Sequence, residues 1–279
     1  MSFRIEAIRS EQVESVHRVS VAVVDESGRR VASAGQSDLC TFWRSAAKPF
    51  QALPMVQDGA AARFGFASRE LALACASHSS EPMHREVCRG MLERLGLSES
   101  ALACGPHPPL SPVVAAQLAK EGASPTSMWS NCSGKHAGML ALALHRGWPV
   151  AGYERQGHPL QERVLAEVSR WTGVPPKDIG LGVDGCTAVC FALPLAAMAT
   201  AYARFGVSDE PAAAKLREAM WTHPELVAGT GRLCTDLMTA ARGRVLAKVG
   251  AEGIYCAALP ERRLGVALKV EDGDGRCSP

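Results

Sequence analysis

Apolar and polar side chains alternate at both ends of the chain, which is typical of strands. Residues 3–8 and 15–35 show this alternation, and Val21, Val23 and Val31 flank a turn at 25–28, as in an antiparallel hairpin. Three more strands are expected near the C-terminus, over residues 244–249, 254–259 and 263–270. Strands at both ends with helices between them predict an α/β protein of the α+β type. Its antiparallel sheet is formed by the N- and C-terminal strands together.

The middle of the chain, about residues 46–240, has the apolar spacing of helices. A first helix is expected to begin near Ala46, with Pro49 in its first turn, because proline lacks the N–H that an interior position needs. A strand at 179–184 is expected to enter a tight turn at Gly185. The other helices are expected at 68–75, 81–96 (capped by Ser80), 111–121, 133–146, 158–172, 190–205, 209–221 and near 231–240. We predict a single domain over residues 1–279.

Composition excludes several classes of function. Hydrophobic residues make up 47% of the chain and charged residues 21%, which is ordinary for a soluble globular protein. A net charge of +2 without a Lys/Arg run argues against nucleic-acid binding, and no segment approaches the roughly 20 apolar residues of a membrane span. The N-terminus lacks an apolar signal core, and none of the ten cysteines forms a Cys-x-x-Cys pair. These features favour a reducing cytoplasm.

Lysine is scarce, with seven lysines among thirty basic residues. Arginine stays charged under all relevant conditions, so a neutral amine must come from lysine. We infer that the remaining lysines are enriched for roles that need a neutral amine. Lys48, Lys135 and Lys248 each fall in a compact segment with other reactive residues.

Ser45 and Lys48 stand three residues apart at the expected start of the first helix. Residues at this spacing share a helix face, so a neutral amine could activate the hydroxyl as a nucleophile. The helix N-terminus would favour an oxyanion and lower the pKa of a nearby lysine. The alternative is that Ser45 caps the helix and Lys48 is a surface charge.

Two further segments offer partners for such a pair. Ser77-His78 follows an apolar helix, so Ser77 could relay a proton or bind substrate, while Ser79 or Ser80 would cap the next helix. Lys248 ends an apolar strand, where it could face the serine helix or be an ordinary strand-end lysine.

The densest reactive segment is Asn131-Cys-Ser-Gly-Lys-His136. Cys132 could be a nucleophile activated by His136 or Lys135. Alternatively, Cys132 could be a thiolate ligand of a metal together with Cys186, which follows a glycine in Asp184-Gly-Cys. Two thiolates, a nitrogen ligand and water would suit zinc.

Together these segments resemble the bacterial type II L-asparaginase family of the Rhizobium etli kind. The resemblance rests on six stretches in order along the chain: Arg44-Ser-Ala-Ala-Lys-Pro-Phe-Gln51, Cys75-Ala-Ser-His78, Asn131-Cys-Ser-Gly-Lys-His-Ala-Gly138, Asp184-Gly-Cys186, Ala228-Gly-Thr-Gly-Arg232 and Lys248-Val-Gly-Ala-Glu-Gly253. It implies a fold similar to serine β-lactamases and penicillin-binding proteins, and hydrolysis of L-asparagine to L-aspartate and ammonia.

The resemblance also implies roles for individual residues. Two Ser-Lys tandems would be catalytic, Ser45 with Lys48 and Ser77 with Lys248. Zinc would be held by Cys132, Lys135 and Cys186, with water completing the shell. The substrate-binding residues would be Arg44, His78, His136 and Asp184. Family members usually continue past the last strand into a further helical segment, so an uncovered sheet face that lowers stability or favours dimerisation is expected here. A homodimer is also expected because symmetric dimers are the commonest oligomers.

Other functions remain open at this point. A Ser-Lys enzyme acting on β-lactams, peptides or esters is disfavoured, because the chain has no Ser-Asp-Asn and Lys-Thr-Gly pair. A cysteine amidohydrolase would use Cys132 as its nucleophile. A non-catalytic, zinc-stabilised binding domain would bind metal without turnover.

Overall fold

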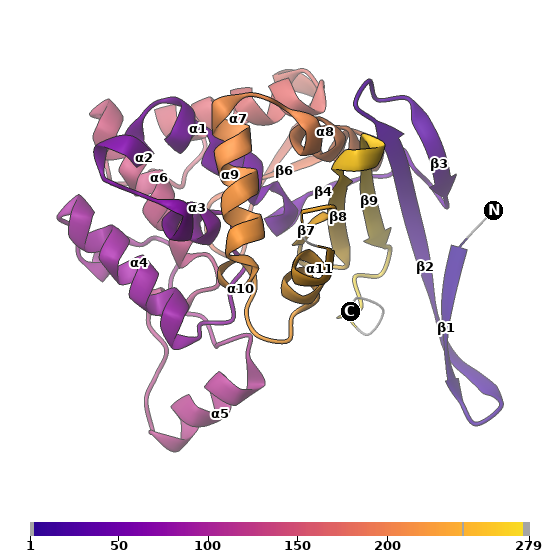
Figure 1. Ribbon diagram of the computed structural model, residues 1–279. Coiled ribbons are helices and arrows are strands. Elements are labelled where there is room, and N and C mark those ends of the chain that lie inside the picture. The colour runs from indigo at the N-terminus through magenta and orange to yellow at the C-terminus, as the bar shows by residue number, and fades with distance from the viewer. Residues whose placement is uncertain (1–2, 242, 276–279) are drawn as a thin grey trace.

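Strands from both ends of the chain pair into one antiparallel sheet, as predicted (Figure 1). The computed structural model describes residues 3–241 and 243–275. Within them the sheet has the order β1-β2-β9-β8-β7, with β3 pairing to β2. Its strands are β1 (Phe3–Arg9), β2 (Gln12–Asp25), β3 (Arg30–Ala34), β7 (Leu246–Val249), β8 (Ile254–Leu259) and β9 (Leu264–Val270). The pairing of β2 with β9 joins the two ends of the chain, so neither half of the sheet is complete alone.

Helix α8 (Leu195–Val207) covers the inner face of this sheet. Small residues allow a close approach: a Cβ at Gly265 of β9 would clash with the backbone of Ala199 in α8. Ala22 and Ala267, which are paired across β2 and β9, are fully buried there. The outer face is apolar but more open, because α11 (Leu233–Ala241) lies over only part of it.

A second, three-stranded sheet is the main departure from the predicted elements. It has the order β4-β6-β5 and consists of β4 (Cys40–Phe42), β5 (Gly180–Val183) and β6 (Val189–Pro194). The prediction of one helix over 190–205 is therefore wrong for its first turn, since residues 190–194 are strand and α8 begins at Leu195. The physical reason is that β6 is paired on both sides and buried. A short apolar run of this kind has no periodicity that separates strand from buried helix.

The other predicted helices lie close to their expected ranges, and two short helices, α2 (Ala60–Arg63) and α10 (Pro224–Val227), were not predicted. The predicted ones are α1 (Lys48–Gln57), α3 (Ser68–Ala74), α4 (Pro82–Leu95), α5 (Pro112–Lys120), α6 (Ser133–Arg146), α7 (Pro159–Thr172) and α9 (Pro211–Thr222). The expected cap of α4 is corrected: Glu81 is the N-cap, whereas Ser80 has a left-handed backbone (φ 62°) and its hydroxyl donates to the carbonyl of Trp129.

An aromatic cluster anchors the start of α1. Trp43 stacks on Phe50 with ring centroids 4.8 Å apart, and Tyr202 and Phe205 of α8 each pack edge-on against Phe50 at 5.4 Å. The Tyr202 hydroxyl donates to the carbonyl of Ala46 at 2.7 Å. Burying each large ring contributes about 1.5–3 kcal/mol, so this cluster holds the segment carrying Ser45 and Lys48 rigidly against the core.

None of the helices formed by residues 3–241 and 243–275 is long and apolar enough to cross a membrane.

Candidate functional site

Segments far apart in the sequence meet around a cavity of about 170 Å³. They come from the start of α1, the loop after residue 103, the start of α6, the turn between β5 and β6, and the loop after β7. The cavity is lined by Arg44, Ser45, Cys104, Pro106, His107, Ser130, Asn131, Cys132, Asp184, Gly185, Cys186 and Ala251. Five of the predicted site residues therefore line one cavity: Arg44, Ser45, Cys132, Asp184 and Cys186.

The backbone is strained at two residues at or next to the cavity lining, Arg44 and Thr187. Arg44, immediately before Ser45, has φ 52°, and Thr187, immediately after Cys186, has φ 73°. Such left-handed residues other than glycine cost on the order of 1–3 kcal/mol each and cluster at functional sites. The Arg44 guanidinium is held in place, because its Nε donates to Asp184 Oδ1 at 2.9 Å. Within the described residues Ser45 Oγ makes no hydrogen bond, which leaves it free to face the cavity.

Behind the cavity wall, two lysine amines converge on one serine. Lys248 Nζ lies 2.7 Å from Ser77 Oγ, and Lys48 Nζ lies 3.0 Å from the same oxygen. All three side chains are buried. Backbone carbonyls orient the amines further: Lys48 donates to Ala76, and Lys248 donates to Val249 at 2.8 Å.

The expected pairing of Lys48 with Ser45 is not made as a direct hydrogen bond. Lys48 instead turns toward the loop carrying Ser77, and its amine also lies 3.4 Å from the carbonyl of Asn131. Ser77 and Lys248 do meet, as the family resemblance implies. Ser77 therefore joins both lysines in one centre, to which Ser45 makes no direct hydrogen bond.

The electrostatics of this centre favour a neutral amine. Burial and, after it, the positive charge of Lys48 together lower the pKa of Lys248 from 10.5 to about 7. At neutral pH a large share of Lys248 is therefore unprotonated, and its lone pair can accept the Ser77 proton. This is the property that the scarcity of lysine suggested.

Another buried amine, that of Lys135, lies in a sulfur-rich cluster whose cysteines line the cavity. Lys135 Nζ donates to Cys186 Sγ at 2.9 Å, and both residues are buried. The Cys132 thiol has two acceptors within reach, Asn131 Oδ1 at 3.0 Å and the Cys186 sulfur. Lys135 and Cys132 come from the start of α6, and Cys186 comes from the turn between β5 and β6.

In this cluster the neighbouring charges oppose burial. The hydrogen bond from Cys132 and the charge of Lys135 hold the pKa of Cys186 well below its ordinary value, although burial alone would raise it. Burial alone would lower the pKa of Lys135, but the Cys186 thiolate raises it above its ordinary value. The hydrogen bond to Cys186 and burial together raise the pKa of Cys132 well above its ordinary value.

The donor set of this cluster suits zinc, which prefers sulfur and nitrogen ligands in a four-coordinate shell. Among the described residues, no group of three or more His, Cys, Asp or Glu side chains is arranged to hold a metal ion. A metal bound between Cys132 and Cys186 would therefore need the Lys135 amine as its third protein ligand. Lysine binds a metal through its neutral amine, so zinc would have to displace the Lys135 proton.

His136 lies beside the sulfur cluster but is not among the residues that line the cavity. Its Nδ1 lies 2.6 Å from the Tyr153 hydroxyl, and its buried Nε2 has no hydrogen-bond partner among the described residues. The ring is nevertheless close enough to Cys186 to lower the pKa of that thiol. In this arrangement His136 helps to keep the Cys186 sulfur negatively charged.

His78 supports the Ser77 loop from behind. Its Nδ1 accepts the N–H of Ser80 at 3.2 Å, and its Nε2 lies 2.9 Å from Ser133 Oγ. The ring is fully buried and stacks on His84 with centroids 4.9 Å apart. Burial and the neighbouring His84 lower the pKa of His78 well below its ordinary value, so the ring is neutral. A direct contact between His78 and substrate would require one of these bonds to break.

The sequence reasoning missed part of the cavity wall. Cys104, Pro106 and His107 line the cavity, although none of them is among the residues predicted for the site. A Gly-Pro-His-Pro-Pro segment shows only that the chain turns there. Its single histidine was the one available signal of chemistry, and a lone histidine is weak evidence.

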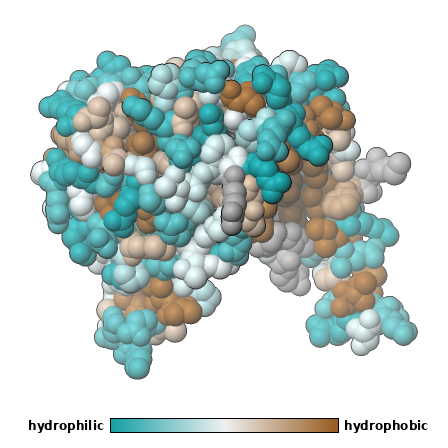
Figure 2. Space-filling model, viewed as in Figure 1, coloured by the Kyte–Doolittle hydropathy of each residue, from teal (hydrophilic) through white to brown (hydrophobic). Residues whose placement is uncertain are grey.

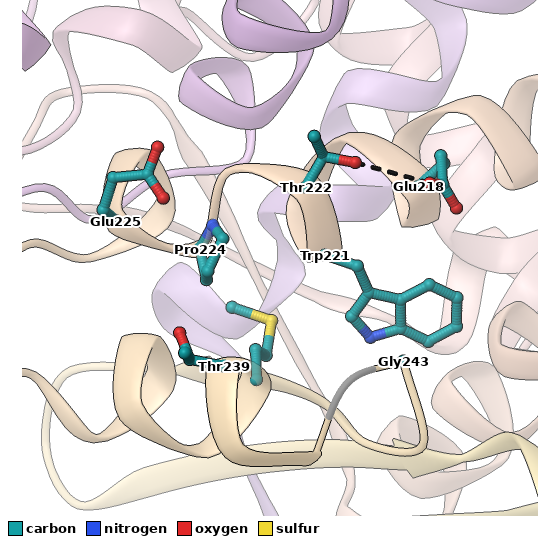
Figure 3. A pocket seen from close by; sticks show the side chains of 8 residues that line it. Glu218, Trp221, Thr222, Pro224, Glu225, Thr239 and Gly243 are labelled. Atoms are coloured by element: carbon teal, nitrogen blue, oxygen red, sulfur yellow. Dashed lines mark hydrogen bonds between the residues drawn. The ribbon is translucent and has the colours of Figure 1, made fainter.

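A larger hollow of about 670 Å³ lies elsewhere, between α9, α10 and α11 (Figure 3). Its wall includes the Trp221 indole, whose N–H is already donated to the carbonyl of Val245 at 2.8 Å, and two carboxylates, Glu218 and Glu225. The lining residues include neither a serine, a cysteine nor a lysine. Volume alone would favour this hollow as the site, but the reactive serine and cysteine side chains line the smaller cavity.

Nearly the whole chain is similar to one family of known proteins. A family model described as L-asparaginase II matches residues 5–279. No match was found among curated proteins.

Among solved structures, Mglu in its native form is similar, with a TM-score of 0.50 and 15% identity over 93% of this chain. The chain spans about three fifths of that protein, 61% of its length. A β-lactamase from Mycobacterium bovis has a TM-score of 0.48 and 14% identity, covering 92% of this chain and 88% of that one. EstCE1, a hydrolase with promiscuous acyltransferase activity, has a TM-score of 0.48 and 13% identity, covering 92% of this chain and 89% of that one.

Proposed function

The chain belongs to the L-asparaginase II family, and from this premise we propose that it hydrolyses L-asparagine to L-aspartate and ammonia through a seryl acyl-enzyme. The observation that supports the proposal most strongly is the position of Ser45. Its hydroxyl faces the cavity, and the paired amines of Lys48 and Lys248 lie behind it on Ser77. A free hydroxyl at the cavity, in front of a buried centre that contains a partly neutral amine, suits nucleophilic catalysis.

In the acylation step, Ser45 Oγ attacks the side-chain amide carbon of asparagine. The Ser45 proton passes to Lys48, and the tetrahedral intermediate then expels the amide nitrogen, which takes up that same proton from the lysine centre and leaves as ammonia. A proton held on Lys48 can move through the Ser77 hydroxyl to Lys248, because both amines contact that oxygen. Water then hydrolyses the ester at Ser45, releases L-aspartate and returns the proton to the serine.

The zwitterionic end of the substrate would be held by Arg44 and Asp184. Both line the cavity, and their side chains form an ion pair 2.9 Å apart with only part of each side chain exposed. Arg44 suits the α-carboxylate and Asp184 suits the α-ammonium group. His78 and His136 would contribute to binding indirectly, His78 through the Ser77 loop and His136 through Cys186.

Zinc is part of the proposal, held by Cys132, Lys135 and Cys186. When bound, it would supply a fixed positive centre at the cavity wall that orients a polar substrate. The protein residues would hold the metal, exclude bulk water from it and keep both sulfurs in place. The Arg44–Asp184 pair would remain the contact for the charged end of the substrate.

The alternative in which Cys132 is the nucleophile has less support. A thiol reacts as its thiolate, and the pKa of Cys132 lies well above its ordinary value. Cys186 is the sulfur that carries the negative charge, and it already accepts a hydrogen bond from the Lys135 amine. The geometry therefore favours Ser45 as the nucleophile.

A homodimer is also proposed, formed through the outer face of the large sheet. An apolar hollow of about 300 Å³ lies on that face, between α11 and strands that include Phe3 and Leu268 (Figure 2). The β1–β2 arm beside it extends away from the body and exposes Ile8 and Val13, 61% and 51% accessible (Figure 1). An unpaired edge strand with exposed apolar side chains is a template for pairing with a second copy. Sedimentation of Ile8→Lys beside the unmodified protein tests this: a smaller particle supports it, and an unchanged monomer contradicts it.

A cytoplasmic location is proposed because the cysteines are not paired in disulfides in the described part of the chain. All nine cysteines in the described part of the chain are free thiols, and eight of them are buried. Proteins that keep many free thiols are typical of a reducing compartment.

Ammonia release from L-asparagine and L-glutamine tests the proposed function, with Ser45→Ala and Cys132→Ser measured alongside. Turnover of asparagine that Ser45→Ala abolishes would support both the reaction and the nucleophile. Turnover that survives in Ser45→Ala would contradict the serine mechanism, and loss of acylation in Cys132→Ser alone would favour the cysteine alternative. Absence of turnover by the folded, zinc-loaded protein would contradict the proposed function.

A further inference from the structure

One wall of the cavity has no regular secondary structure to hold it. Cys104, Pro106 and His107 form this wall, in the stretch between a short helical turn at 99–101 and α5. A loop that lines a substrate cavity needs tethers if the cavity is to keep its shape. Cys104 itself donates weakly to the carbonyl of Ser127 at 3.5 Å, and two stronger tethers meet on the residue immediately before the wall, Ala103.

Both backbone groups of Ala103 are held by side-chain hydroxyls. Its N–H donates to the Tyr153 hydroxyl at 3.0 Å, and its carbonyl accepts from the Thr187 hydroxyl at 2.9 Å. Ala103 is therefore fixed from two directions, and the residues that follow it take their starting position from these two bonds.

The first tether leads to the helix that carries Lys135. The Tyr153 hydroxyl accepts from Ala103, so its single proton is available to His136 Nδ1, 2.6 Å away. Tyr153 is 1% exposed, and its ring packs edge-on against His136. One buried hydroxyl thus joins the cavity wall to the residue next to Lys135 in α6.

The second tether leads to the turn that carries Cys186. Thr187 follows Cys186 and has φ 73°, a conformation that is a rare outlier for a β-branched residue. The turn is held by hydrogen bonds from Thr187 N to the Asp184 carbonyl at 2.8 Å and from Asp184 N to the Ala188 carbonyl at 2.9 Å. Thr187 therefore pays a backbone penalty in the conformation that brings its hydroxyl to Ala103.

We propose that Tyr153 and Thr187 are positioning residues that together fix the 104–107 wall, and that they set the selectivity of the cavity between amide side chains of different length. The selectivity part rests on the proposed function. Both tethers begin next to the sulfur cluster and end on one residue, so they set the distance across the cavity. Asparagine and glutamine differ by one methylene, and a rigid wall can discriminate such a difference by about 10–200-fold.

The test uses Tyr153→Phe and Thr187→Val, which remove the hydroxyls and keep the shapes of the side chains. Thr187→Ser is the rescue variant, because it keeps the hydroxyl. Ser169→Ala is a matched control, because it removes a similar hydroxyl-to-carbonyl bond (2.7 Å to Val174) at a loop far from the cavity lining. Each protein is measured for amide hydrogen exchange at residues 103–107, for melting temperature, and for kcat and KM on both amides.

We expect faster exchange at 103–107 in Tyr153→Phe and Thr187→Val, and a fall of about tenfold in the ratio of kcat/KM for asparagine over glutamine, mainly through KM for asparagine. Thr187→Ser and Ser169→Ala should keep the wild-type exchange and ratio. The double variant should lose less than the sum of the two single losses, because both bonds hold the same residue.

The positioning role is overturned if Tyr153→Phe and Thr187→Val only lower the melting temperature and keep the wild-type ratio. It is also overturned if Thr187→Ser behaves like Thr187→Val. Exchange at 103–107 is read without turnover: unchanged exchange in Thr187→Val rejects the tether even in a protein that hydrolyses neither amide. Inactivity of the wild type on both amides instead rejects the proposed function and the selectivity that rests on it.

Discussion

Two buried lysines near one cavity, Lys248 and Lys135, have opposite protonation behaviour. Lys248 and Lys135 are both withdrawn from solvent, and burial acts on both in the same direction, toward the neutral amine. Lys248 faces a second amine, Lys48, so its pKa falls to about 7. Lys135 faces the Cys186 thiolate, so its pKa rises. The pKa of a buried lysine is therefore sensitive to its surroundings, and the charge of the nearest neighbour decides whether that pKa falls or rises.

This difference divides the site into two kinds of chemistry. Lys248 can exchange a proton with Ser77 near neutral pH. The Lys135–Cys186 pair is a fixed pair of opposite charges, which only a metal ion or the loss of one partner would rearrange. The predictions below test this division, from the largest expected effect to the smallest.

Lys248→Met should cause the largest loss. It removes the amine that lies 2.7 Å from Ser77 and that is partly neutral at pH 7. Removing a general base costs about 10²–10⁴-fold in rate. The measurement is kcat on L-asparagine, with melting temperature as the check on folding. A folded Lys248→Met that keeps more than a tenth of the activity would place the proton transfer elsewhere.

Lys135→Met should chiefly lower stability. It leaves the Cys186 thiolate buried without its partner, and breaking one side of a buried ion pair costs about 3–5 kcal/mol. The measurement is denaturant unfolding of metal-free protein, with Lys135→Arg as the control that keeps a positive charge. Lys135→Arg should unfold closer to the wild type yet fail to retain zinc, because a guanidinium does not lose its proton. Equal stability of Lys135→Met and the wild type would show that Cys186 is an ordinary thiol.

The free energy of unfolding should depend on pH through Lys248. Unfolding returns this amine to its ordinary pKa of 10.5, so between about pH 7 and 10.5 the unfolded chain binds more protons than the folded one. The contribution of Lys248 to stability is therefore least favourable below pH 7 and improves as pH rises, by up to about 1.4 kcal/mol per pH unit.

Unfolding of the wild type minus that of Lys248→Met, measured at several pH values, isolates this contribution. Activity should rise with pH through about 7 for the same reason, as the amine becomes neutral. A difference that stays flat from pH 7 to 10 would mean that Lys248 keeps an ordinary pKa in the folded protein.

Cys75→Ala should have the smallest effect on the site. Cys75 lies within electrostatic reach of both Lys248 and Lys48, much as Cys186 lies beside Lys135. Burial raises the pKa of Cys75 to about 12, so this cysteine is a neutral thiol at neutral pH. Its removal should leave the pH at which Lys248 titrates in place. A clear shift of the pH–activity profile in Cys75→Ala would show that Cys75 carries charge, and the contrast with Cys186 would then fail.

The fold was predictable where the pattern was periodic and unambiguous. The alternation at both ends gave the antiparallel sheet, and prolines and serines at helix starts gave most helix positions. The stretch 190–194 was mistaken for helix because an apolar run in a doubly paired strand looks the same as a buried helix turn. The site was predictable in its residue types, since Ser45, Lys48, Ser77, Cys132, Cys186 and Lys248 all lie at or directly behind the cavity.

The sequence by itself determined which reactive groups exist: a few lysines where arginine would not serve, serines at the start of a helix and after another, and cysteines beside glycines. Tertiary structure decided which of these groups meet. It placed Lys48 on Ser77, and it brought the 104–107 wall to the cavity through Ala103. It also decided the charge of each amine, because a pKa depends on burial and on the nearest charges, and those neighbours come from distant parts of the chain.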